Sequence, residues 1–196
     1  MNEVKQLWLL AGGKGSGKST FYRIQLQPQG MPFVNADILA KELFPEQQEQ
    51  RSYEAARLAE QIRLQLIRER RTFCFETVFS HPSKIDFVAQ AKTFGYEVVL
   101  VFIHLDNTVL NNARVSQRVE EGGHSVPENK VSERIPRTLK NIRQVLPLCD
   151  SVYLLDNSRS DNPFKQIAVL GDGVVTAKQS PLPQWAKDLL VDYLAE

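Results

Sequence analysis

The chain has 196 residues, a length typical of one domain with a substantial hydrophobic core. Its 24 lysines and arginines nearly balance 23 aspartates and glutamates, which argues against nucleic acid or a membrane surface as partner. The start, MNEVKQ, lacks the features of a signal peptide, and no apolar run reaches the roughly 18 residues of a membrane span. We therefore expect a cytoplasmic protein, with Cys74 and Cys149 as buried free thiols.

A glycine-rich stretch, AGGKGSGKST, directly follows the apolar run at residues 7–10. It fits G-x-x-x-x-G-K-[ST], the spacing of a phosphate-binding loop between a strand and a helix. Glycines allow the backbone to turn tightly and approach an oligophosphate, the lysine can bridge the β- and γ-phosphates, and the hydroxyl can bind Mg²⁺. We predict an ATP and Mg²⁺ site formed by Gly12, Gly13, Lys14, Gly15, Ser16, Gly17, Lys18, Ser19 and Thr20.

The segments that follow alternate between strand and helix patterns. Strands are expected at 7–10, 32–37, 72–77, 97–103 and 151–155, and helices at 38–43, 47–71 and from 80–83 to 95. This order predicts an α/β, three-layer P-loop NTPase fold with a mostly parallel five-stranded sheet. The charged positions of the long helix are expected to face solvent: Glu54, Arg57, Glu60, Arg63, Arg68 and Glu69.

Two helices at 107–121 and 128–146, joined by a Gly-Gly loop, interrupt this order. Seven lysines and arginines against four glutamates between Arg114 and Arg143 suit a helical lid over phosphates, about residues 114–146. A basic, solvated helical hairpin is the alternative. Pro136 is expected to bend the second helix. A β-hairpin and a helix at about 164–196 complete what we expect to be a single domain, 1–196.

Carboxylates just beyond strand ends are favoured as site residues, because ligands of open α/β sheets lie at the carboxyl ends of the strands. Glu76 ends the third strand and is a candidate for the Mg²⁺ shell or for a substrate hydroxyl. Asp37 could accept the proton of an attacking hydroxyl, although it also suits a helix N-cap. Asp106 better suits a helix start. His81, His104 and His124 share no metal-ligand spacing, so capping or surface positions are favoured.

Together with the phosphate loop, four further stretches resemble a known family in the same order along the chain. They are FVNADILA at 33–40, FETVFS at 75–80, RVEEGGHSVPENKVSERIPRTLKN at 118–141 and YLLDNS at 153–158. On these residues the chain resembles the zeta-toxin-like P-loop kinases, including compact relatives labelled predicted ATPases. The resemblance covers most of residues 6–158.

The resemblance implies a kinase that transfers the γ-phosphoryl group of ATP to a hydroxyl, which in the toxin members belongs to UDP-N-acetylglucosamine. It implies Lys18 and Ser19 as phosphate and Mg²⁺ groups, Asp37 as general base, Glu76 with Thr77 in the acceptor site, Asn157 in the cofactor site, and Arg118, Arg134 and Arg137 as lid cations. Lys14 stands where a small polar residue is expected, and the chain is shorter than the full toxins. The alternative function is an ATP-binding, slowly hydrolysing switch that acts through a protein partner such as an antitoxin.

Overall fold

One seven-stranded sheet forms the centre of the protein. The computed structural model describes residues 4–105 and 128–194, and the strand order is β2-β3-β1-β4-β5-β6-β7. The first five strands in this order are parallel, and the last two are antiparallel to their neighbours. The strands are β1 (Gln6–Ala11), β2 (Phe33–Val34), β3 (Phe73–Thr77), β4 (Glu97–His104), β5 (Ser151–Asp156), β6 (Lys165–Gly171) and β7 (Val174–Lys178).

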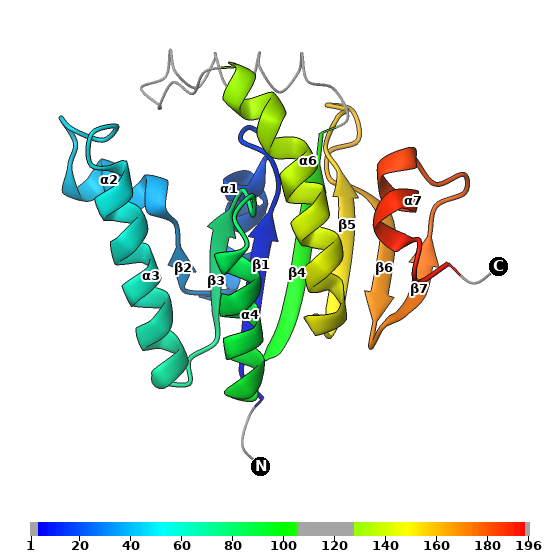
Figure 1. The fold of residues 1–196 in the computed structure, drawn as a ribbon, viewed down its shortest axis with the longest axis horizontal. Coiled ribbons are helices and arrows are strands. Elements are labelled where there is room, and N and C mark those ends of the chain that lie inside the picture. Colours follow the sequence, from blue (N-terminus) through cyan, green and yellow to red (C-terminus); the bar gives the residue numbers. More distant parts are fainter. Residues whose placement is uncertain (1–3, 106–127, 195–196) are drawn as a thin grey trace.

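Helices cover both faces of this sheet, which confirms the predicted three-layer P-loop fold. In Figure 1, α3, α4 and α6 cross one face, whereas α1 lies on the opposite side. The helices are α1 (Lys18–Phe21), α2 (Ala36–Leu43), α3 (Ser52–Arg68), α4 (Ser83–Thr93), α6 (Glu128–Val145) and α7 (Gln184–Leu190). A π-helical turn (Tyr22–Leu26) and a 3-10 turn (Gln27–Gln29) continue α1, and a further 3-10 turn (Leu146–Leu148) follows α6.

The alternating side chains of β1 explain why both faces of the sheet must be covered by other elements. Leu7 and Leu9 belong to a large apolar cluster that includes side chains of α3, α4, α6 and α7, whereas Leu10 belongs to a second cluster with the turn after α1. Successive side chains of a strand point to opposite faces, so a strand that is apolar throughout must be buried twice. Cys74 and Cys149 are buried free thiols, as predicted.

The predicted five-stranded sheet was too small. The hairpin β6–β7 forms as expected, but β6 pairs antiparallel with β5, placing Leu154 opposite Ala168. The sheet therefore gains two strands, because the hairpin satisfies the backbone groups that the outer edge of β5 would otherwise expose.

Other boundaries differ by a few residues. The strand expected at 32–37 shortens to Phe33–Val34, and the helix expected at 47–71 begins at Ser52. Of the predicted lid, the helix at 107–121 and the loop to 127 lie outside the described residues, as do Asp106 and His124, whereas α6 confirms the second helix. None of the helices in the described ranges combines the length and the apolar character that a membrane span requires.

Candidate functional site

The phosphate loop joins β1 to α1 and carries its lysine in a buried position. The Lys18 side chain is 5% exposed, and its Nζ donates to the carbonyl oxygens of Gly12 (3.0 Å) and Gly13 (2.8 Å). Its Nζ also lies 3.5 Å from Oε1 of Glu76. The loop therefore holds a buried ammonium group beside its own backbone, where an oligophosphate would be bound.

Two glycines of the loop are required by their surroundings. Gly12 has a φ of 150°, and a Cβ at this position would collide with the Ile103 carbonyl oxygen. Gly17 has a φ of 95°, and its Cβ would lie 2.5 Å from Nδ2 of Asn157. Asn157 is buried and donates from Nδ2 to the Ser16 carbonyl at 2.9 Å, so it stabilises the conformation of the loop. The structure thus places Asn157 against the loop rather than among the residues that line the cavity described below.

Glu76 connects the loop with the end of β2. Its Oε2 accepts from Ser19 Oγ at 2.6 Å and from Asn35 Nδ2 at 2.8 Å. These contacts follow from the parallel pairing of β1 with β3, which sets Leu10 beside Glu76 and Ala11 beside Thr77. The pairing of β3 with β1 brings Ser19 and Glu76 together as one oxygen-rich group.

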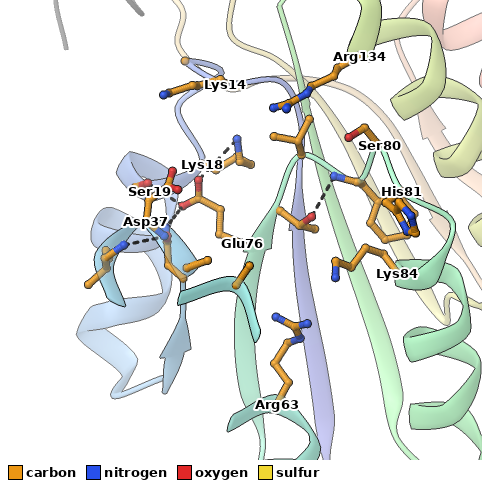
Figure 2. A pocket seen from close by; sticks show the side chains of 18 of the residues that line it. Lys14, Lys18, Ser19, Asp37, Arg63, Glu76, Ser80, His81, Lys84 and Arg134 are labelled. Atoms are coloured by element: carbon orange, nitrogen blue, oxygen red, sulfur yellow. Dashed lines mark hydrogen bonds and ion pairs between the residues drawn. The ribbon is translucent and has the colours of Figure 1, made fainter. Parts of the chain in front are cut away.

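Asp37 lies in the first turn of α2 and is exposed on the wall of a cavity of about 610 Å³. Lys14, Lys18, Ser19, Glu76 and Thr77 line the same cavity, as Figure 2 shows for those it labels. The N-cap interpretation of Asp37 is wrong. Asn35 is the cap of α2, and its Oδ1 accepts from the backbone N–H groups of Asp37 (2.8 Å) and Ile38 (3.2 Å).

Helix α6 contributes Arg134 to the same cavity, and Pro136 lies inside this helix. Two hydrogen bonds hold α6 against the loop after β3. Thr138 Oγ1 donates to the Val78 carbonyl, and Asn141 Nδ2 donates to the Phe79 carbonyl, both at 3.0 Å.

The other predicted lid cations are placed differently. Arg137 is exposed and is not among the described residues that line the cavity. Arg118 lies outside the described residues. Of the loop residues, Gly15 also lines the cavity; Gly13 lines a smaller one, with Arg134, and Thr20 lies on α1.

One basic residue of the cavity contradicts the sequence analysis. Arg63 was expected on the solvated face of its helix, but its side chain is 5% exposed and lines the cavity. Its guanidinium carbon lies 5.0 Å from the ring centre of Phe75 and 5.2 Å from that of Phe87. Lys84, at the start of α4, lines the cavity too. The sequence did contain an indication that Arg63 is buried. It follows Ala59 by four residues and precedes Ile67 by four, which places it on the buried stripe of α3.

The histidines do not form a metal site in the part of the chain that is described. No group of three or more histidine, cysteine or acidic side chains comes together there. His81 interacts through Nδ1 with Ser83 Oγ (2.9 Å) and accepts from the Ser83 backbone N–H, and it is exposed, so the surface position expected for it is confirmed, whereas the N-cap of α4 is Pro82. His104 is buried and stacks on Trp185 at 4.5 Å between ring centres, so a surface position for it was wrong.

Oxygen ligands for Mg²⁺ are nevertheless present. Mg²⁺ needs only one or two protein oxygens, because phosphate oxygens and water complete its shell. Ser19 and Glu76, with their oxygens 2.6 Å apart beside Lys18, supply such a donor set. The residues therefore fit a magnesium ion held together with bound phosphates.

Known proteins share both the sequence pattern and the fold. A family model described as AAA domain matches residues 7–142, more than half of the chain. An uncharacterized protein of Haemophilus influenzae is 29% identical over 137 residues, which cover 66% of this chain and 97% of that protein.

Two solved structures support the fold assignment. AvrRxo1-ORF1:-ORF2 with ATP is 19% identical with a TM-score of 0.70, covering 88% of this chain and 60% of that one. The PezAT chromosomal toxin-antitoxin system of Streptococcus pneumoniae is 18% identical with a TM-score of 0.63, covering 81% and 70%. The chain spans less than two thirds of the AvrRxo1 chain it matches, and identities this low establish the fold alone. The chain therefore belongs to the P-loop family that the AAA domain model describes, with the fold of the zeta-toxin-like kinases.

Proposed function

We propose that this protein is an ATP- and Mg²⁺-dependent kinase that transfers the γ-phosphoryl group to a hydroxyl of a small molecule. The observation that carries the proposal is that Asp37 and Lys18 line one cavity of about 610 Å³. A cavity of this size can admit the end of a triphosphate together with a small acceptor. A slowly hydrolysing switch would need the phosphate loop, but it would not need room for an acceptor beside Asp37.

In the proposed reaction, each residue has a separate task. The acceptor hydroxyl attacks the γ-phosphorus, its proton passes to the Asp37 carboxylate, and the bond from the γ-phosphorus to the bridging oxygen breaks, which releases ADP. Lys18 and Arg134 offset charge on the transferring phosphoryl oxygens. Glu76 and Thr77 are proposed to orient the acceptor, and Arg118 and Arg137 are proposed as further cations on the phosphates.

Magnesium is proposed to be held by Ser19, with Glu76 in its surrounding shell. When bound, it would neutralise charge on the β- and γ-phosphates. The hydrogen bond from Ser19 Oγ to Glu76 and the neighbouring Asn35 amide keep these oxygens in place in the protein itself.

The acceptor follows from the resemblance and stays a proposal. A nucleotide sugar such as UDP-N-acetylglucosamine is the first candidate. An antitoxin is the proposed protein partner, because one protein of similar fold belongs to the PezAT toxin-antitoxin system and another forms the AvrRxo1-ORF1:-ORF2 complex.

The test is γ-labelled ATP with Mg²⁺ and a panel of nucleotide sugars and cell extracts, assayed for a labelled small molecule. Asp37→Asn should reduce transfer at least about 100-fold, in the range of general-base catalysis, and leave ATP affinity nearly unchanged. Asp86→Asn, an exposed aspartate on α4, is the matched control and should transfer at the wild-type rate.

Two results would contradict the proposal. Unchanged transfer by Asp37→Asn would remove Asp37 from the mechanism. Label released only as free phosphate, whatever acceptor is offered, would favour the switch that acts through a protein partner.

A further inference from the structure

A buried cation at the end of the cavity forms no ion pair with the residues that the structure describes, although the charge of Glu60 acts on it from a distance. Arg63 is 95% buried, and its Nε and Nη2 atoms have no hydrogen-bond partner among residues 4–105 and 128–194. Burial lowers the pKa of this guanidinium, with Glu60 opposing the shift, but an arginine stays charged inside proteins. Buried polar atoms are nearly always hydrogen-bonded, so each exception requires an explanation.

The packing around Arg63 explains its position but does not satisfy its donors. The faces of Phe75 and Phe87 stabilise the charge, yet an aromatic face does not replace a hydrogen-bond acceptor. Lys84 lines the same part of the cavity, and the pKa of its ammonium group is lowered by burial and then by the charge of Arg63. Two cations that repel each other across a cavity wall are typical of a site for an anion.

This pair is separate from the groups assigned to ATP. Figure 2 shows Lys14 and Arg134 at one end of the cavity and Arg63 at the other, with Asp37 and Glu76 between them. Triphosphate held by the phosphate loop is therefore on the far side of Asp37 from Arg63. A molecule with its hydroxyl at Asp37 would extend its remaining groups toward Arg63 and Lys84.

We propose that Arg63 and Lys84 form a subsite for an oxyanion of the acceptor, so that the acceptor carries a carboxylate or a phosphate besides its hydroxyl. This inference rests on the proposed kinase function and narrows its substrate class. A planar guanidinium can donate two parallel hydrogen bonds to such a group, and Lys84 adds a point charge. The hydroxyls of a neutral sugar or polyol can accept from Arg63 but do not offset its charge, so neutral acceptors should bind more weakly than anionic ones.

The experiment is a binding titration with the phosphate loop already filled. The full chain is saturated with Mg²⁺ and a non-hydrolysable ATP analogue, and the Nε–H signal of Arg63 is followed by NMR and assigned by its loss in Arg63→Lys. The probes are glycerate, glycerol 3-phosphate and glycerol, which share hydroxyl groups and differ in the anion. Glycerate or glycerol 3-phosphate should shift the signal saturably and glycerol should not; the tighter anion identifies the acceptor as a carboxylate or a phosphate.

Variants separate the subsite from a structural role. Lys84→Gln should weaken binding of the anionic probe at least about tenfold, as expected for loss of a charge-assisted contact. Arg57→Gln, an exposed position on the same helix, should bind as the wild type does. Arg63→Met keeps the apolar stem and should abolish probe binding, which is measured by calorimetry because the Arg63 signal is gone. It should not lower the stability of the fold, because it removes a buried charge that has no hydrogen-bonded counter-ion among the described residues.

The subsite is refuted if neither anion moves the Arg63 signal, or if glycerol binds as tightly as the anions. Equal binding by Lys84→Gln and the wild type would refute it even if Arg63→Met failed to fold. Because no phosphoryl transfer is measured, this result is independent of whether Asp37→Asn loses activity.

Discussion

Asn35 should contribute more to stability than its size suggests, because its side chain makes two kinds of contact. The amide oxygen caps α2, and the amide nitrogen donates to Glu76 at 2.8 Å. An N-cap is worth about 1 kcal/mol, and a hydrogen bond to a charged group about 1.5 to 3 kcal/mol. Glu76 keeps Ser19 and Lys18 as partners, which favours the lower end of that range.

The expected loss in Asn35→Ala is therefore about 2 to 3 kcal/mol of unfolding free energy, or a melting temperature lower by about 4 to 12 °C for a chain of this size. Asn35→Ser separates the two contacts, because a serine can cap the helix but has no amide to reach Glu76. It should recover about 1 kcal/mol of the loss. Urea unfolding of both variants measures these differences.

A double-mutant cycle with Glu76→Ala tests the contact between the two side chains directly. The coupling energy between Asn35→Ser and Glu76→Ala should be about 1 kcal/mol, as expected for neighbours in one hydrogen-bond network. A coupling near zero, or equal losses in Asn35→Ala and Asn35→Ser, would refute the two-contact argument.

Two further predictions concern backbone strain and pH. Gly17→Ala should lower the free energy of unfolding by at least twice the roughly 1 kcal/mol expected for Gly30→Ala, as measured by urea unfolding of both variants. Both glycines have a positive φ, but only at Gly17 does the new Cβ meet Asn157. Burial raises the pKa of the Cys149 thiol from 9.0 to about 12. Above pH 9 the folded state keeps a thiol proton that the unfolded chain releases. The contribution of Cys149 to the free energy of unfolding is therefore complete below pH 9 and falls above it, by at most about 1.4 kcal/mol per pH unit. Cys149→Ala should show a weaker decline between pH 9 and pH 11.

The phosphate loop was predictable because its information is local. The glycines, lysine and hydroxyl of residues 12–19 are set by spacing along the chain, and a strand must precede them. The strand-end rule also selected Asp37 and Glu76, since the carboxyl ends of parallel strands share one edge of the sheet. The cap was harder to choose, because Asn35 and Asp37 both suit it and only the observed hydrogen bonds of Asn35 distinguish them.

Arg63 and the hairpin depended on long-range contacts. On α3 the expected order is reversed, since Ile62 is 36% exposed and its neighbour Arg63 is 5% exposed. Periodicity identifies the buried stripe, but it assigns an arginine to solvent unless something across the fold, here Phe75 and Phe87, receives it. In the same way, the hairpin pattern gave two strands but contained no information about the edge of β5 to which they would add.

The charge distribution links these findings to the choice of ligand. Six lysines and arginines and two carboxylates line the cavity, although the whole chain has a formal charge of only +1. The remainder of the chain is therefore net negative. We expect this distribution to favour a small anion, which can enter the positively charged cavity, over a long nucleic acid, which would also meet the rest of the surface. A balanced composition is thus compatible with phosphate chemistry, because the positive charge is concentrated where ATP and an anionic acceptor are proposed to meet.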